Sequence, residues 1–185
     1  MRTACLLAFT IGAAAWAQQE STPVFGTTVV ISSGLRGTVY HIHRGSPVLP
    51  DFQKLKPKGV IYTTSLDIPP QDFRAGFPGV TKRNEWFAID YTGRFWIEDA
   101  SIYSFSLLSD DGSILYIDDA SVIDNDGQHP PAEKRGDAYL AHGVHSVRVS
   151  YFQGPRFQVA LQLKIAAPGQ AFRIFDTNEL KPPAD

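Results

Sequence analysis

Apolar and polar residues alternate in short runs along most of the chain, and glycine, proline, aspartate and asparagine separate the runs. In residues 144–152, Val147, Val149 and Tyr151 fall on one side, and polar residues stand between them. No long stretch places apolar residues at the spacing of a helix. Because such alternation is typical of strands with one buried and one wetter face, the sequence predicts an all-β protein.

Several segments carry the strand pattern clearly, and turn-forming residues bound each of them. They are residues 34–43, 60–66, 85–97, 102–108, 113–118, 144–152 and 157–165. Many short strands at this spacing favour an antiparallel β-sandwich or a barrel.

Turn-forming residues between these strands predict how the strands are connected. Gly154, Pro155 and Arg156 predict a short hairpin between the last two strands, and the segment LLSDDGSIL at 107–115 predicts another between 102–108 and 113–118. Thr92 and Gly93 are expected to interrupt the strand at 85–97. Residues 45–57 and 68–82 are rich in proline and glycine, and we expect them to be loops.

The N-terminus has the pattern of a secretory signal peptide, with Arg2 ahead of an apolar run and small residues before Gln18. Cleavage is expected after residue 17. The apolar run is too short for a transmembrane helix, and nothing later in the chain has the length to span a bilayer. We therefore expect a secreted protein, periplasmic or extracellular. Residues 18–185 are expected to form one domain with a core at about 30–167 and a short C-terminal tail.

Charge and cysteine content exclude several classes of function. The chain has 17 Lys and Arg against 19 Asp and Glu, a net charge of −2 with histidine neutral, so it lacks the basic character of most nucleic-acid-binding domains. Its one cysteine, Cys5, lies within the signal peptide. The exported chain therefore has no disulfide, no zinc–thiolate site and no cysteine nucleophile.

The pair Asp110 and Asp111 has two interpretations. Asp-Gly between two apolar runs is a common hairpin turn, because glycine accepts positive φ and aspartate caps the turn. The alternative is a cation site, which requires a kink, since adjacent side chains on a regular strand point to opposite faces. A tight turn or a non-proline cis peptide would supply that kink. Two converging carboxylates are hard oxygen ligands of the kind that calcium takes.

The other motifs give weaker evidence of a metal site or of catalysis. Residues 122–133 match an EF-hand loop in part, but Val122 occupies the first ligand position and two prolines follow, so we expect a polar loop whose Asx side chains bond their own backbone. His41 and His43 would share a strand face, which is weak evidence for zinc without a third ligand. The sequence has no nucleophile elbow and no phosphate-binding glycine loop, so we expect no catalytic activity.

Aromatic residues are dense in residues 86–96. Most of them are expected to lie in the core, since this stretch has the alternation of a strand. A minority at the sheet edge could stack on a sugar ring.

The order of the motifs resembles the PA14 domain family, a β-sandwich named for a fragment of anthrax protective antigen and shared with glycan-binding domains of yeast adhesins. Three blocks carry the resemblance: WFAIDYTGRF at 86–95, YSFSLLSDDGSILYIDDASVIDNDGQH at 103–129 and GVHSVRVSYFQGPRFQVALQL at 143–163. The likeness extends over about residues 30–167. It implies a jelly-roll-like antiparallel sandwich.

The resemblance also implies a site. In the adhesins, the aspartates that match Asp110 and Asp111 are joined by a cis peptide and hold calcium, whose shell is completed by vicinal sugar hydroxyls. The same comparison makes Gly112 part of the ligand-binding turn. It also makes Gln153 a metal ligand, as the only amide in the loop where the adhesins use asparagine.

Together these features predict a secreted, non-catalytic, lectin-like domain that binds a glycan or polysaccharide with calcium at Asp110 and Asp111. The alternative is an extracellular or envelope domain that binds another protein or has a structural role, without metal. The absence of an asparagine near Gln153 favours this second hypothesis.

Overall fold

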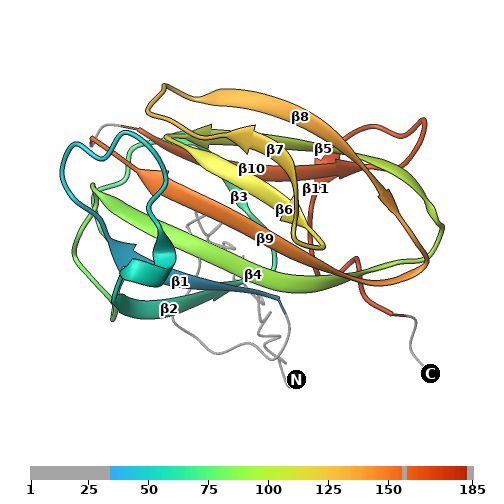
Figure 1. The fold of residues 1–185 in the computed structure, drawn as a ribbon, viewed down its shortest axis with the longest axis horizontal. Coiled ribbons are helices and arrows are strands. Elements are labelled where there is room, and N and C mark those ends of the chain that lie inside the picture. Colours follow the sequence, from blue (N-terminus) through green and yellow to red (C-terminus); the bar gives the residue numbers. More distant parts are fainter. Residues whose placement is uncertain (1–33, 156–157, 183–185) are drawn as a thin grey trace, which may run out of the picture.

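The computed structural model describes residues 34–155 and 158–182, which form two antiparallel sheets packed face to face (Figure 1). The six-stranded sheet has the order β2-β1-β4-β9-β6-β7. The five-stranded sheet contains β11-β10-β5-β8 in that order, and β3 also pairs with β10. The predicted antiparallel sandwich is confirmed.

The strands are short except for β4, β5, β8 and β9. Their bounds are β1 Leu35–His41, β2 Pro57–Thr63, β3 Asp67–Gln71, β4 Phe87–Ile97, β5 Ser101–Asp110, β6 Ser113–Ile117, β7 Ala120–Asn125, β8 Ala132–Leu140, β9 Gly143–Gln153, β10 Val159–Ala166 and β11 Arg173–Ile174. One 3₁₀ turn, η1, spans Phe52–Lys54 in the loop between β1 and β2.

The core lies between the sheets and follows directly from the alternation in the sequence. On β10, Val159, Leu161 and Leu163 are buried, whereas Gln162 and Lys164 are partly exposed. Aromatic rings form part of this core, and its fully buried ones are Phe87, Tyr91, Phe105, Tyr151 and Phe175. Since each such ring removes a large apolar area from water, these residues carry much of the driving force for folding.

Both predicted hairpins are wrong. β9 pairs with β4 and β6 in one sheet, while β10 pairs with β5, β3 and β11 in the other. β5 and β6 are likewise in different sheets. The chain therefore crosses from one sheet to the other at Asp111 and Gly112, and again after Gln153. Strand alternation gives the buried face of each strand but not its partner, so local sequence could not distinguish a hairpin from a crossing.

The predicted interruption of β4 is also wrong, because the strand continues through Thr92 and Gly93. A Cβ at Gly93 would lie 2.7 Å from Leu35 Cδ2. The glycine at this point is therefore explained by the close approach of β1 and not by a turn.

Several strands fall outside the predicted set. β3 contains two prolines, within residues expected to be a loop, and β8 is rich in charged residues because it ends the five-stranded sheet. The core extends beyond its predicted end at about residue 167, since β11 pairs with β10 and Phe175 is fully buried. The predicted signal peptide, residues 1–17, lies outside the described residues. Within the described ranges, no helix is both long and apolar enough to cross a membrane.

A polar pair of the buried His145 and the half-exposed Asp118 ties the start of β9 to the turn between β6 and β7. His145 Nδ1 lies 2.6 Å from Asp118 Oδ2, and its Nε2 lies 2.8 Å from the carbonyl oxygen of Ala141. Burial by itself would lower the pKa of His145, but the Ala141 and Asp118 oxygens raise it above its ordinary value. Burial opposes ionisation of Asp118 too, yet the bonds from His145 and Ser146 lower its pKa.

Replacing Phe105 with alanine is expected to lower the free energy of unfolding by about 3–5 kcal/mol, because the ring is fully buried between the sheets. The matched control is Val144→Ala on the surface, which is expected to change stability by less than about 0.5 kcal/mol. Urea unfolding of both variants measures the difference. Equal effects of the two substitutions would contradict the assignment of Phe105 to the core.

The Asp118→Asn variant is expected to be less stable than the unchanged chain by no more than about 1 kcal/mol, since Asp118 is half exposed and water screens the pair. A raised folded pKa for His145 means that its contribution is full below about pH 6.5 and is lost as pH rises through the folded value. The lowered pKa of Asp118 means that its contribution is present above about pH 4 and is lost in acid. Unfolding measured from pH 3 to 8 should show the largest difference between about pH 4 and 6.5.

Candidate functional site

Asp110 and Asp111 stand where the chain leaves β5 and crosses to β6. Asp110 is the last residue of β5, and the peptide bond between the two aspartates is cis. Both side chains line one hollow of about 260 Å³ at the surface. The other residues that line it are His129, Pro130, Pro131, Pro155 and Gln158. The two carboxylates that the sequence singled out therefore face the same space.

Asp111 is held by two backbone donors from other parts of the chain. The N–H of Gly154 donates to its Oδ2 at 2.7 Å, and the N–H of His129 donates to its Oδ1 at 3.2 Å. No described group donates to the Asp110 carboxylate. Asp111 is thus fixed in place, while Asp110 has its acceptor capacity directed at the hollow.

Gln153 is fully buried beneath the carboxylates, and its amide is turned with the nitrogen toward them. Nε2 lies 3.5 Å from Asp111 Oδ2 and donates to the carbonyl oxygens of Pro155 and Gln158 at 3.0 and 3.1 Å. Its Oε1 accepts from the Tyr151 hydroxyl at 2.6 Å. In this arrangement Gln153 holds the loop and the carboxylate in position, and its oxygen faces the protein interior.

The electrostatics of the pair oppose ionisation. Burial, followed by the charge of Asp111, raises the pKa of Asp110 to about 6, although His129 acts in the opposite direction. Burial also raises the pKa of Asp111, and the N–H groups of Gly154 and His129 limit the rise. Two partly buried carboxylates whose pKa values are raised are a costly arrangement, which is a common property of functional sites.

The PA14 domain model matches residues 63–173, which is more than half of the chain. The chain belongs to the PA14 domain family. The resemblance drawn from its motifs is therefore confirmed.

Solved structures share the fold of this PA14 domain. The PA14 sugar-binding domain of an RTX adhesin is 20% identical, with a TM-score of 0.65 over 79% of this chain and 96% of that one. The PA14 domain of the antifreeze protein MpAFP is 19% identical, with a TM-score of 0.66 over 88% and 94%. The A domain of Epithelial Adhesin 9 from Candida glabrata, in complex with Galβ1-3GlcNAc, is 14% identical, with a TM-score of 0.58 over 81% and 88%.

This chain spans about half the length of two anti-sigma factor domain-containing proteins that also share the fold, covering 49% and 48% of them. No curated protein matches the sequence significantly.

Polar residues that the sequence did not single out support the Asp-Asp corner of the PA14 domain. Ser113 Oγ donates to Ser109 Oγ at 2.7 Å, and Asn125 Nδ2 donates to the same oxygen at 3.0 Å and to the Ala132 carbonyl at 3.0 Å. All three side chains are buried. The signal available in the sequence was the pair of serines on either side of Asp110–Gly112. Their contact with Asn125 depends on the tertiary structure and has no signal in the local sequence.

Gly112, expected to contact ligand, is packed tightly within the corner. A Cβ at this position would lie 2.4 Å from the Phe152 ring and 2.7 Å from Asp126 Oδ1. The structure therefore gives Gly112 a packing role, because the lack of a side chain lets the β5–β6 corner lie close to Phe152 and to the loop at Asp126.

The 122–133 loop and His41 have structural contacts. The N–H of Asp126 donates to Asp124 Oδ1 and that of Gly127 to Asp126 Oδ1, which confirms a loop capped by its own Asx side chains. His41 bonds to Thr81. Across residues 34–155 and 158–182, no three His, Cys, Asp or Glu side chains come together as a metal cluster. Most of the aromatic stretch is buried as expected, and Trp96 is the partly exposed exception.

Replacing Gln153 with leucine is expected to lower the free energy of unfolding by about 2–4 kcal/mol. The substitution leaves the carbonyl oxygens of Pro155 and Gln158 without the amide that donates to them, and each such loss costs about 1–3 kcal/mol. The Tyr151 hydroxyl loses one of its two acceptors and keeps the Asp110 carbonyl oxygen. The control is Gln128→Leu, because that side chain bonds only the exposed Ser46 carbonyl. Urea unfolding with a near-neutral result for Gln153→Leu would contradict the role given to this amide.

Proposed function

We propose that this PA14 domain is a non-catalytic carbohydrate-binding domain in which Asp110 and Asp111 hold a calcium ion that binds sugar hydroxyls. The observation that carries the proposal is the pair of carboxylates that line one hollow, with Asp110 bonded to no described donor. The RTX adhesin domain is described as sugar-binding, and the Epithelial Adhesin 9 domain is in complex with a disaccharide. Both share this fold, which adds support.

The residues present fit a calcium ion in part. Asp110 offers both carboxylate oxygens, and Asp111 keeps acceptor capacity beyond its two N–H bonds. Calcium takes six to eight oxygen ligands, so two carboxylates leave places for water or ligand hydroxyls. Because Gln153 Oε1 accepts from Tyr151, its predicted role as a metal ligand would require the amide to turn. We therefore assign Gln153 to positioning Asp111.

When bound, the ion would supply attraction for hydroxyl oxygens, and it would favour ionisation of both carboxylates, which repel each other without it. The loops around the hollow, including Pro130, Pro131 and Gln158, would limit which sugar enters. The signal peptide predicted at residues 1–17 leads us to expect this binding outside the cytoplasm.

The second candidate is an extracellular or envelope domain that binds a protein partner without metal. It is favoured by the hydrogen bonds that Asp111 already accepts and by the inward orientation of the Gln153 oxygen. On this hypothesis, the aspartate pair would serve to tie the loops at the corner of the sandwich.

Calcium titrated into the chelator-treated chain is expected to bind with a micromolar Kd and to raise the melting temperature. In the Asp110→Asn/Asp111→Asn variant both effects should be lost, because the carboxylate charge is removed while size is kept. The matched control is Asp99→Asn/Asp119→Asn, which removes the same charge elsewhere on the surface. Calorimetry and thermal unfolding are the measurements.

A glycan array screened with calcium and then with chelator tests the rest of the proposal. Glycan binding that depends on calcium and on the aspartate pair is the expected result. Absence of calcium binding in the unchanged chain would overturn the metal site, and glycan binding that is unaffected by the aspartate substitutions would overturn the mechanism.

A further inference from the structure

Three arginines gather on the outer face of the six-stranded sheet. Thr92 of β4 lies opposite Arg36 of β1 on one side and opposite Arg148 of β9 on the other. Neighbouring strands are about 4.8 Å apart, so the Cα atoms of these two arginines are roughly 10 Å from each other. Arg94 stands two positions along β4 from Thr92, on the same face, about 7 Å away.

The positive charge of this face is only partly neutralised by described residues. Arg148 pairs with Asp90 at 2.8 Å and lies over the rings of Phe52 and Tyr116. Arg36 donates to the hydroxyl of Thr38 and has no described acidic partner. No described residue bonds the exposed Arg94. One further carboxylate lies beside this face, since Trp96 Nε1 donates to Glu98 Oε2 at 3.0 Å. Arg36, Arg94 and Arg148 still outnumber Asp90 and Glu98, so the face is positive on a chain whose net charge is −2.

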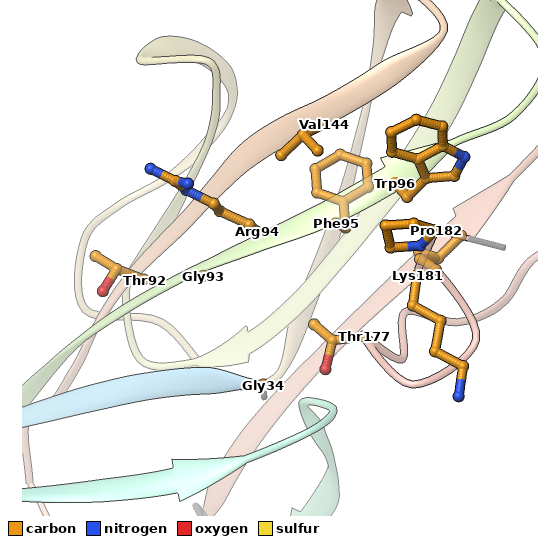
Figure 2. Close-up of a pocket in the computed structure, with 11 residues that line it drawn as sticks. Gly34, Thr92, Gly93, Arg94, Phe95, Trp96, Val144, Thr177, Lys181 and Pro182 are labelled. Carbon is orange, nitrogen blue, oxygen red and sulfur yellow. The ribbon is translucent and has the colours of Figure 1, made fainter. Parts of the chain in front are cut away.

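A hollow of about 620 Å³ lies beside these arginines, at the end of β4 (Figure 2). Thr92, Arg94 and Trp96 line it from β4, Val144 lines it from β9, and Lys181 lines it from the C-terminal segment. Figure 2 shows Arg94 and Lys181 toward opposite ends of the hollow, with Trp96 near Pro182. The hollow is thus bordered by cations, an indole ring and threonine hydroxyls.

We propose that this outer face, which we call the arginine face (Arg36, Thr92, Arg94, Trp96, Arg148 and Lys181), binds an acidic polysaccharide. The arginines would bind its carboxylate or sulfate groups, for which the planar guanidinium is well suited. Trp96 would pack against a sugar ring, and Thr92 would bond its hydroxyls. Charge complementarity sets the anionic character of the partner, and the mixture of ring and hydroxyl groups favours a glycan over an acidic protein.

The arginine face is separate from the Asp110–Asp111 corner. Phe87, at the start of β4, lies opposite Gln153 beneath the corner, whereas Trp96 is nine positions further along the strand. At about 3.3 Å per residue, this places the Trp96 end roughly 30 Å from the corner. The inference does not depend on the proposed calcium site, and the two sites would contact different parts of a long chain.

Binding of alginate, a polyuronate, and of heparin, a sulfated glycan, to the full chain tests the proposal in chelator at low salt. We expect at least one of them to bind and neutral dextran not to bind. The Arg36→Glu/Arg94→Glu variant should weaken the binding at least tenfold. Trp96→Ala should weaken it severalfold, and added salt should weaken it further. The measurements are calorimetry and retention on immobilised polysaccharide, with thermal unfolding to confirm that each variant is folded.

The matched control is Lys134→Glu/Arg135→Glu on β8, in the opposite sheet, which changes the net charge by the same amount. An equal loss of binding in this variant would show that overall charge decides the interaction and would overturn the proposal. Failure of both alginate and heparin to bind the unchanged chain would overturn it too. Polyglutamate that binds as tightly as the polysaccharides would replace the glycan with an acidic protein as the partner. Because chelator is present throughout, none of these results depends on the Asp110–Asp111 site.

Discussion

The carboxylate of Asp111 joins three parts of the chain that are far apart in sequence. It accepts hydrogen bonds from the N–H groups of Gly154 and His129, so the corner between β5 and β6, the end of β9 and the loop before β8 meet at one side chain. A buried carboxylate without such donors would be strongly unfavourable. The geometry of the whole corner therefore depends on these bonds, and so does the hollow into which Asp110 faces.

Close packing around that corner explains why glycine occupies positions 112 and 154. A Cβ at Gly112 would collide with Phe152, and a Cβ at Gly154 would lie 3.0 Å from Asp111 Oδ2. Tyr151 spans the layer beneath, with its hydroxyl 2.6 Å from both the Asp110 carbonyl oxygen and Gln153 Oε1. Buried side chains support the candidate site from below, which is the arrangement that precise ligand positioning requires.

The sandwich presents two surfaces of opposite charge. The corner gathers carboxylates around one hollow, whereas the arginine face gathers guanidinium groups on the outer face of the six-stranded sheet. At least five residues of β4, from Phe87 to Thr92, or roughly 16 Å, separate them. Since charges more than a Debye length apart are largely screened from each other in physiological salt, each surface keeps its own electrostatic character. On the two proposals, one small domain would combine a cation-dependent site with an anion-binding face.

The sequence by itself determined the fold class, the main core strands and the aspartate pair. Alternation on β9 and β10 fixed which side chains are buried, because side-chain direction on a strand follows from local geometry. Only the tertiary structure decided the strand partners. The two predicted hairpins became crossings between sheets, since pairing depends on contacts distant in sequence. The orientation of the Gln153 amide, the support from Asn125 and the alignment of Arg36 with Arg148 across Thr92 depend on the same register, which no local pattern encodes.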